Sequence, residues 1–259
     1  MDLDLKNKNA LVTGGSHGIG RSIALALAKE GCNVAICGLD KKEIDDTTRE
    51  IEEKNVKSIG VVADVKILAD VDNVIKTISD LWGVIDILVN NVGGGGGRVS
   101  TSVEETPEEL WADVYNRNAL AAIRFTTKII PFMKKQKWGR VVTIASLNGK
   151  EGGGRPWYNM AKSAEISLMK TLAMDKETVR LGITFNSIAP GAIIFEGNEW
   201  DVFQNENPKK FKNMEDLKPL GRLGQPEEIA GIVAFLCSKK ASFINGACIS
   251  ADGGESKSF

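Results

Sequence analysis

Seven short apolar runs recur along the chain, and longer amphipathic segments separate most of them. The runs cover residues 9–13, 33–37, 58–62, 85–90, 140–145, 184–188 and 247–250. They are apolar along most of their length rather than at alternate positions, as is typical of strands covered on both faces. Such strands alternating with helices predict an α/β fold: a doubly wound parallel sheet of about seven strands, with helices on both faces.

The segments between these runs carry apolar residues at helical spacing. We predict helices over residues 18–31, 41–55, 68–82, 107–136, 156–181 and 226–237. In the longest of them we expect a kink near Asn118 and an end near Pro131, because proline removes a backbone donor. Its start has the pattern of a capping box, with Thr106 as the cap, Pro107 next and Glu109 third in the helix.

The length and the regular pattern favour one domain over residues 1–259. Single α/β domains often reach 200–250 residues, and no low-complexity linker divides the chain. Residues 192–218 depart from the alternation, since they mix Asn, Glu, Lys and Phe without a clear period. We interpret this stretch as an irregular substrate loop or lid.

Charge and composition exclude several classes of protein. The 33 Lys and Arg residues nearly balance 34 Asp and Glu residues, so there is no basic field for nucleic acid. The longest apolar runs fall far short of the ~18 residues of a membrane span, and a cytoplasmic protein without a membrane partner is expected. The single histidine, His17, excludes a histidine-rich metal site, and no metal is predicted. The four cysteines lack metal-ligand spacing and are expected to be free thiols.

A glycine-rich turn follows the first predicted strand. Gly14, Gly18 and Gly20 stand where that strand ends and a helix begins. Bare backbone at such a turn lets a pyrophosphate approach the amides and the dipole of the helix N-terminus. The plain alternative is a tight turn without a ligand. His17, inside the turn, is either a surface residue or a contact to a cofactor phosphate.

A second pattern points to proton-transfer chemistry. Tyr158 and Lys162 stand four residues apart on a predicted helix, so their side chains leave the same face. Free tyrosine has a pKa of about 10, and a neighbouring ammonium favours the phenolate form. Such a tyrosine can act as general acid or base on a carbonyl or alcohol oxygen, to which Ser146 can donate a hydrogen bond. Tyr115 has no lysine four residues on and is the weaker candidate.

The chain resembles the short-chain dehydrogenase/reductase family, in particular its short single-domain branch with 3-oxoacyl-acyl-carrier-protein reductase-like members. The resemblance covers nearly the whole chain and starts from the GxxxGxG spacing of the glycine turn. The further motifs, in the family's order, are Asp64 after the third strand, the NNVG run at 90–93, Asn118, Ser146, Tyr158 with Lys162, Pro190-Gly191 and Asp252-Gly253-Gly254.

The resemblance implies a Rossmann fold and an NAD(P)-dependent oxidoreductase that interconverts a ketone and a secondary alcohol. It implies a catalytic set of Asn118, Ser146, Tyr158 and Lys162, with the tyrosine as general acid or base. It also implies a homotetramer, which the apolar residues 226–250 near a sheet edge favour. Cofactor contacts are implied at Gly14, Ser16, His17, Gly18, Ile19, Gly20, Leu39, Asp64, Val65, Asn91, Gly93, Tyr158, Lys162, Pro190, Gly191 and Ile193.

The choice of coenzyme depends on the end of the second predicted strand. Asp40 lies at the usual distance from the glycine turn for an acid that binds the ribose of NAD. Aligned by strand, however, the family's acid falls at Gly38 and its NADP-binding arginine at Leu39, so neither is present. Gly38 leaves room for a phosphate, and the cations available nearby are His17, Lys41 and Lys42. The balance slightly favours NADP(H) over NAD(H).

Two glycine runs, residues 93–97 and 152–154, each adjoin an arginine, Arg98 and Arg155. In a doubly wound sheet both loops lie at the carboxyl edge, beside the ligand crevice. They are either flexible loops with solvated arginines or, together with Trp157, a cradle for an anionic small-molecule substrate.

Two side chains depart from the family's pattern. Phe195 stands where a threonine often contacts the nicotinamide carboxamide, which leaves the backbone near Ile193 for this contact. Val92 replaces the usual alanine.

Two other functions use the same fold. An epimerase or dehydratase of the related extended branch shares the YxxxK pattern, but its chains carry a longer C-terminal substrate domain. A non-catalytic dinucleotide-sensing regulator would have no need of the intact set at 118, 146, 158 and 162.

Overall fold

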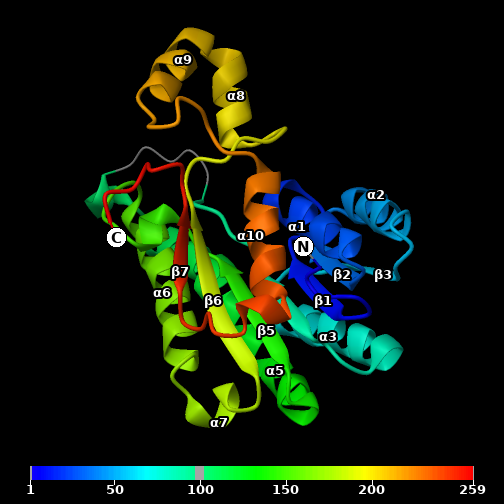
Figure 1. Ribbon diagram of the computed structural model, residues 1–259. Helices are drawn as coiled ribbons and strands as arrows, with labels where there is room; N and C mark the ends of the chain where they lie inside the picture. The colour runs from blue at the N-terminus through cyan, green and yellow to red at the C-terminus, as the bar shows by residue number, and fades with distance from the viewer. Residues whose placement is uncertain (1, 97–101, 259) are drawn as a thin grey trace.

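The computed structural model describes residues 2–96 and 102–258, and its centre is a seven-stranded parallel sheet (Figure 1). The strands are β1 (Asn9–Thr13), β2 (Asn33–Gly38), β3 (Ser58–Val62), β4 (Ile87–Asn90), β5 (Gly139–Ile144), β6 (Ile183–Pro190) and β7 (Cys248–Ala251). They are ordered β3-β2-β1-β4-β5-β6-β7. The predicted fold class is therefore confirmed. The order reverses between β1 and β4, where sheets of this kind bind ligands beyond their carboxyl ends.

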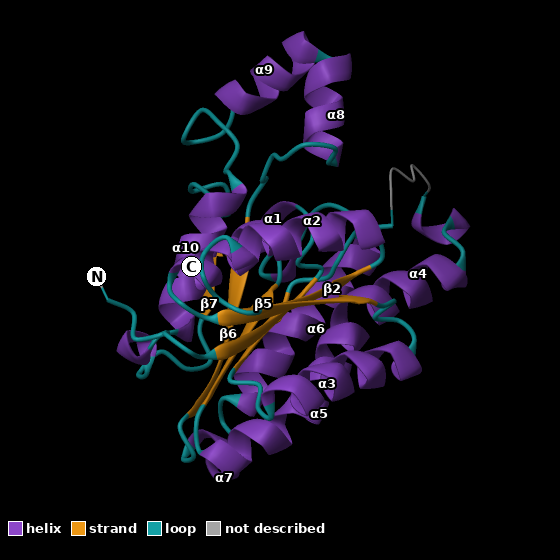
Figure 2. Ribbon diagram, turned by 90° about the vertical axis from the view of Figure 1, so that its right-hand side faces the viewer, coloured by secondary structure: helices purple, strands orange, loops and turns teal. Residues whose placement is uncertain are grey.

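Helices cover the sheet in two layers (Figure 2). One layer holds α1 (Gly18–Lys29), α2 (Lys41–Glu52) and α10 (Pro226–Cys237), and the other holds α3 (Leu68–Trp82), α5 (Ala121–Gln136) and α6 (Pro156–Leu172). Each layer buries its own apolar core, centred on Ile23 and Val233 in the first and on Val74 and Phe125 in the second. In the ranges that the structure describes, every helix is too short or too polar to cross a bilayer.

The long helix predicted over 107–136 is present in three parts. They are α4 (Glu108–Tyr115), a π-helical turn (Asn116–Leu120) and α5. The expected kink near Asn118 is this π turn, but the end near Pro131 is wrong, because α5 continues past the proline to Gln136. Burial of Ile129 and Met133 against the sheet outweighs the one backbone bond that the proline removes.

Two other predicted helix limits are also wrong. Pro107, not Thr106, occupies the N-cap position of α4, and the Thr106 hydroxyl donates to the carbonyl of Ser102 instead. The helix predicted over 156–181 ends at Leu172, and a short helix α7 (Lys176–Val179) follows. Asp175 starts it by accepting a hydrogen bond from the Glu177 amide.

Residues 192–218 are not irregular, as the sequence had suggested. They hold α8 (Glu199–Glu206) and α9 (Pro208–Asp216), which project together beyond the carboxyl edge of the sheet at the top of Figures 1 and 2. Phe203 and Phe211 pack edge to face across the two helices, with ring centroids 6.1 Å apart. The pair is mostly polar, so its apolar period is too weak to read from the sequence. We refer to it as the α8–α9 hairpin.

Candidate active site

The carboxyl ends of the strands open into a cavity of ≈ 1060 Å³, at the upper end of the usual sizes of ligand sites. Its wall combines the turn after β1, the ends of β2 to β6, one face of α6 and the start of α8. Predicted site residues in this wall are Gly14, Ser16, His17, Ile19, Gly20, Leu39, Asp64, Val65, Asn91, Gly93, Ser146, Arg155, Tyr158, Lys162, Pro190, Gly191 and Ile193. The fold thus brings together side chains from most of the sequence.

The glycine turn fits a dinucleotide pyrophosphate. Gly14 and Gly18 have φ of 61° and 52°, a backbone conformation that favours glycine. A Cβ on Gly20 would lie 2.1 Å from the carbonyl oxygen of Gly14, which also accepts a hydrogen bond from Asn91 Nδ2 at 3.1 Å. Ile19 and Gly20 in the first turn of α1 line the cavity, where the amides and the dipole of the helix start favour phosphate.

Gly18 differs from the other predicted cofactor contacts. It is not in the wall formed by the described residues, because the Phe195 ring covers it: a Cβ on Gly18 would lie 2.6 Å from that ring. Phe195 also packs against His17, with ring centroids 5.2 Å apart. His17 is half exposed and its Nδ1 lies 3.9 Å from Oε1 of Glu43. It is thus at once a surface residue and part of the cavity wall.

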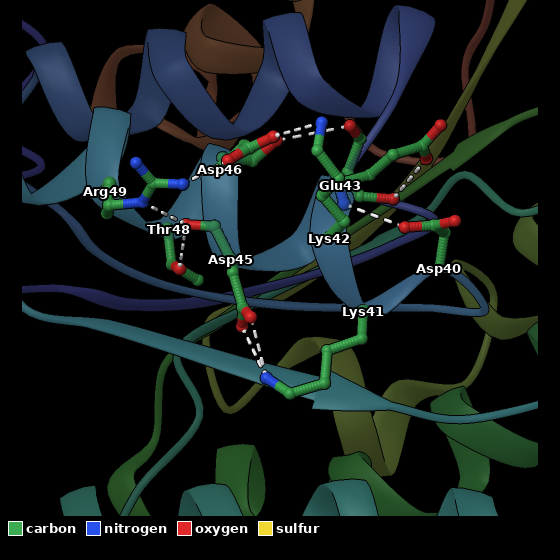
Figure 3. A network of polar contacts seen from close by, with 10 residues as sticks. Asp40, Lys41, Lys42, Glu43, Asp45, Asp46, Thr48 and Arg49 are labelled. Carbon is green, nitrogen blue, oxygen red and sulfur yellow. Dashed lines mark hydrogen bonds and ion pairs between the residues drawn. The ribbon is translucent and has the colours of Figure 1, made fainter.

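Just after the end of β2, a carboxylate that no sequence motif indicates faces the cavity. Glu43, in the first turn of α2, lines the wall together with Gly38 and Leu39, and Oγ of Ser16 donates to its Oε2 at 3.3 Å. Asp40 caps α2 by accepting a hydrogen bond from the Glu43 amide at 2.9 Å (Figure 3). Two carboxylates therefore lie near the position expected for the adenosine ribose.

The two lysines expected beside that ribose point elsewhere. Lys41 pairs with Asp45 at 2.7 Å and Lys42 with Asp46 at 3.3 Å, both along α2 (Figure 3). Their side chains are 74% and 87% exposed, and neither is in the wall that the described residues form. The expectation that they attend a coenzyme phosphate is not supported, because helical spacing favours their pairing with the aspartates one turn on.

Ser146, Tyr158 and Lys162 meet in the cavity wall at the end of β5. Ser146 follows this strand closely, and its Oγ accepts a hydrogen bond from the Asn148 amide at 3.2 Å. Tyr158 lies in the first turn of α6, and Lys162 lies one turn later on the same face. The lysine Nζ is 5.8 Å from the centroid of the tyrosine ring.

Lys162 is 2% exposed, yet its ammonium is well supported. It donates to the carbonyl of Ile144 at 2.9 Å and to the carboxylate of Glu165 at 2.9 and 3.2 Å. Burial is the largest single effect and opposes its charge, but the charges of Glu165 and Tyr158 and the hydrogen bond to Glu165 together outweigh burial, so the pKa of Lys162 lies above its usual range. Burial raises the pKa of the Glu165 carboxyl to about 7, with Lys162 acting in the opposite direction.

Asn118 lies behind the cavity wall rather than in it. It is fully buried in the π turn, a feature frequent at functional sites. Its Nδ2 donates to the carbonyls of Val114 and Gly94, and its Oδ1 accepts from the Gly94 amide at 3.1 Å. Asn118 therefore holds the glycine loop after β4, which passes beside Lys162.

The two loops expected to hold a substrate are only partly described. Arg98 lies outside the described residues. Arg155 lines the cavity, where its Nη1 donates to the Gly95 carbonyl at 3.3 Å and its Nη2 lies 3.8 Å from Oε2 of Glu199. Gly152 and Gly153 face open space.

Trp157 lies outside the cavity wall that the described residues form. It is buried, packs edge to face on Trp111 and donates from Nε1 to the Gly95 carbonyl at 3.0 Å. Trp157 therefore supports the glycine loop from behind. The ring belongs to the buried face of α6, which the position of Trp157 two residues after Arg155 does not indicate.

A glycine turn at a helix N-terminus, a doubly wound sheet and a Tyr–Lys pair in one cavity define a nicotinamide-dependent oxidoreductase. The family model described as enoyl-(acyl carrier protein) reductase matches residues 14–256. The chain belongs to the short-chain dehydrogenase/reductase family, and it is an NAD(P)-dependent oxidoreductase that interconverts ketones and alcohols.

Individual relatives support this assignment. A 3-oxoacyl-[acyl-carrier-protein] reductase FabG of Staphylococcus epidermidis is 36% identical over 250 residues, which cover 96% of this chain and 98% of the relative. The structure of L-sorbose reductase from Gluconobacter frateurii, complexed with NADPH and L-sorbose, superposes with a TM-score of 0.91 at 30% identity and full coverage of both chains. An NAD+-bound xylitol dehydrogenase gives a TM-score of 0.87 at 28% identity, covering 97% of this chain and 100% of that one.

Sequence reasoning missed two residues of this site. Glu165 has a signal in the sequence, namely a carboxylate three residues after Lys162 on a helix face that is otherwise mostly apolar. Glu43 has no such signal in the sequence, because the charged segment 41–55 predicts an exposed helix. Only the fold shows that one of its carboxylates faces the cavity.

Proposed function

We propose that Tyr158 is the general acid and base of this oxidoreductase, assisted by Ser146 and Lys162. The observation that carries the proposal is the buried, charged Lys162 Nζ, 5.8 Å from the centroid of the Tyr158 ring, with both side chains in the cavity wall. A positive charge at that distance stabilises the negative charge that develops on the tyrosine oxygen during proton transfer.

Each residue then has a distinct part in the reaction. A bound nicotinamide supplies the hydride in reduction and accepts it in oxidation. Tyr158 gives its hydroxyl proton to the carbonyl oxygen in reduction and takes a proton from the alcohol in oxidation. The Ser146 hydroxyl accepts from the Asn148 amide, and its own hydrogen can donate to the substrate oxygen.

The variant Tyr158→Phe tests this assignment. It removes the hydroxyl and keeps the ring, so turnover should fall at least about 100-fold, the usual scale of general acid–base catalysis, while coenzyme affinity changes little. Nicotinamide absorbance, measured with both coenzymes over a panel of ketones and alcohols, gives the turnover. Near-normal turnover of the variant would remove Tyr158 from the mechanism.

For the coenzyme, we propose a preference for NADP(H). The L-sorbose reductase that resembles this chain carries NADPH, and Gly38, which has no side chain to fill the cavity, lines it together with His17. The opposing observations are the Glu43 carboxylate in the same wall and the xylitol dehydrogenase that carries NAD+. Comparing kcat/KM for the two coenzymes decides between them.

For the substrate, we propose a small ketone or alcohol with an anionic group that Arg155 binds. Arg155 is the arginine of the two glycine loops that the structure describes, and it faces the cavity with its charge only partly met by Glu199 at 3.8 Å. A guanidinium can hold a carboxylate or phosphate through two parallel hydrogen bonds.

We also propose that the protein is a homotetramer. β7 is an edge strand of the sheet, and Phe243, five residues before it, is fully exposed. A second copy that covers this edge would bury it. The cytoplasmic location expected from the sequence stays a prediction. No observation of the cavity favours a regulator, an epimerase or a dehydratase.

A further inference from the structure

Glu165 is a buried carboxylate that the proposed acid–base mechanism does not use. Its side chain is 2% exposed, and its partner Lys162 is 3% exposed. Removing a carboxylate from water costs several kcal/mol unless a partner of opposite charge compensates it. The burial of the Glu165 carboxylate is therefore tolerated because Lys162 lies beside it.

The contacts of the Lys162 ammonium come mainly from Glu165. Nζ carries three hydrogens. The Ile144 carbonyl at the end of β5 accepts at 2.9 Å, and the Glu165 carboxylate accepts at 2.9 and 3.2 Å. Two of these three accepting oxygens belong to Glu165, and Lys162 itself lines the cavity. Glu165 thus fixes the direction of the ammonium as well as its position.

The charge of Lys162 also depends on Glu165. Burial alone lowers the pKa of a lysine, whereas here the carboxylate raises it, and Tyr158 acts in the same direction. Charged residues on the elements packed against α6 are Glu108, Glu109 and Asp113 of α4, Arg117 of the π turn and Arg140 of β5. None of these is among the groups that shift the pKa of Lys162 or Glu165.

We propose that Glu165 is a positioning residue of the active site, which keeps Lys162 charged and holds its ammonium beside Tyr158 in the cavity wall. It touches neither substrate nor reacting atoms and acts only through Lys162. The inference rests on the proposed acid–base roles of Tyr158 and Lys162.

The variant Glu165→Gln tests this role, because glutamine keeps the size and one acceptor but removes the charge. Without that charge, burial lowers the pKa of Lys162, so the lysine loses its proton on the alkaline side of neutrality. The kcat of alcohol oxidation should fall modestly near pH 7, and the ratio of parent to variant kcat should grow at least about tenfold toward pH 10. Glu165→Asp keeps the charge, so its pH profile should follow that of the parent.

Asp86→Asn is the matched control. Asp86 is also a buried carboxylate paired with a lysine, Lys8, at 3.1 Å, but it lies at the opposite end of the sheet, before β4. Its loss should lower the melting temperature and leave the pH profile unchanged. If Glu165→Gln does not fold, Glu165→Leu, which fills the same space without charge, is measured in its place.

Two results would overturn the proposal: a variant as active as the parent, or a loss of kcat that is the same at every pH, as a merely structural role would give. Failure of the proposed function is a separate result. In that case the parent protein itself shows no nicotinamide-dependent turnover, or Tyr158→Phe retains it.

Discussion

A methyl group on Gly93 would lie 2.9 Å from Nζ of Lys162 and 2.6 Å from Oδ1 of Asn118. The loop after β4 therefore passes α6 so closely that only a bare backbone fits. The glycine at this position allows the ammonium to reach the cavity wall while the π turn holds the loop from the other side. This contact joins three segments that are far apart in the sequence.

Gly93→Ala should accordingly lower turnover, by at least about tenfold, since misplacement of a reacting group by a fraction of an ångström has effects of this size. The added methyl group displaces Lys162 or Asn118 from its partners. Turnover and coenzyme affinity are measured together, and both should be impaired.

Gly152→Ala is the control for that substitution. It belongs to the second glycine run, and a Cβ there meets no atom within 4 Å. The control should behave as the parent protein. Equal activity of both alanine variants would show that the loop can shift without harm to the site.

Coenzyme preference offers a second prediction. The Glu43 carboxylate lies in the cavity wall near Gly38, where it repels a 2′-phosphate and can accept a hydrogen bond from a 2′-hydroxyl. Glu43→Gln should raise the ratio of kcat/KM for NADP(H) to that for NAD(H) by about tenfold. Asp46→Asn removes a carboxylate from the same helix that pairs with Lys42 and Arg49 instead (Figure 3), and it should leave the ratio unchanged. An unchanged ratio in the Glu43 variant would place the 2′ group elsewhere.

The sheet could be predicted from the sequence because its strands are short, apolar and separated by strong helical patterns. The Tyr158–Lys162 pair could be predicted for a related reason, since local helical geometry alone puts both side chains on one face. Asp64, Asn91 and Ser146 follow strands directly, and parallel strands bring their ends to one edge. The sheet, the Tyr158–Lys162 pair and the residues at the strand ends thus follow from local sequence together with the topology of a parallel sheet.

The rest depends on contacts that local sequence does not encode. The continuation of α5 past Pro131 is decided by burial against the sheet, and the α8–α9 hairpin has too weak an apolar period to be recognised. The fold brings the Glu43 carboxylate next to the Ser16 hydroxyl of the turn after β1, and no local pattern in the sequence indicates this contact. The role of Glu165 can be inferred only from the structure, which shows that Lys162 is buried.

The buried thiols give a prediction on pH and stability. Burial raises the pKa of Cys37 to about 12, from 9.0 in an exposed thiol. Native Cys37 keeps its proton where the unfolded chain releases it, so its contribution to the free energy of unfolding is complete below pH 9 and declines as the pH rises toward 12. Between pH 9 and pH 10 the decline is about 1 kcal/mol.

Cys37→Ala should therefore reduce that decline by about 1 kcal/mol, measured by denaturant unfolding at both pH values. The alanine variant is less stable at each pH because a small cavity remains, but the slope with pH is the quantity tested. Cys248→Ala, at a partly exposed thiol, is the control for the loss of a thiol as such. A parent slope in the Cys37 variant would contradict the prediction.

Assembly can be tested at an exposed apolar pair. Asn245 Nδ2 donates to the Ala173 carbonyl at 2.9 Å, which brings Phe243 and Met174 to the same region next to β7, and both side chains are exposed. Sedimentation of the parent should show a tetramer, and the double variant Phe243→Asp, Met174→Asp should give smaller species. Leu81→Asp, at an exposed residue of α3, should sediment as the parent does. A monomeric parent at micromolar concentration would refute the tetramer.

The last prediction concerns the charge of the substrate. Arg155 donates to the Gly95 carbonyl at 3.3 Å and lies 3.8 Å from Glu199 of the α8–α9 hairpin, so its guanidinium is placed in the cavity wall but not saturated. Charge-assisted hydrogen bonds contribute about 1.5–3 kcal/mol each. Arg155→Ala should therefore raise KM for an anionic ketone by about 10- to 100-fold and leave the coenzyme KM unchanged.

Glu199→Gln separates this role from a purely structural one. Removing that carboxylate leaves more of the positive charge of Arg155 available, so KM for the anionic ketone should fall, in the direction opposite to Arg155→Ala. Added salt should raise KM of the parent protein, since partly exposed charges are screened. If neutral and anionic ketones of the same shape react equally in all three proteins, Arg155 serves only to fix the Gly95 loop, and the anionic substrate is excluded.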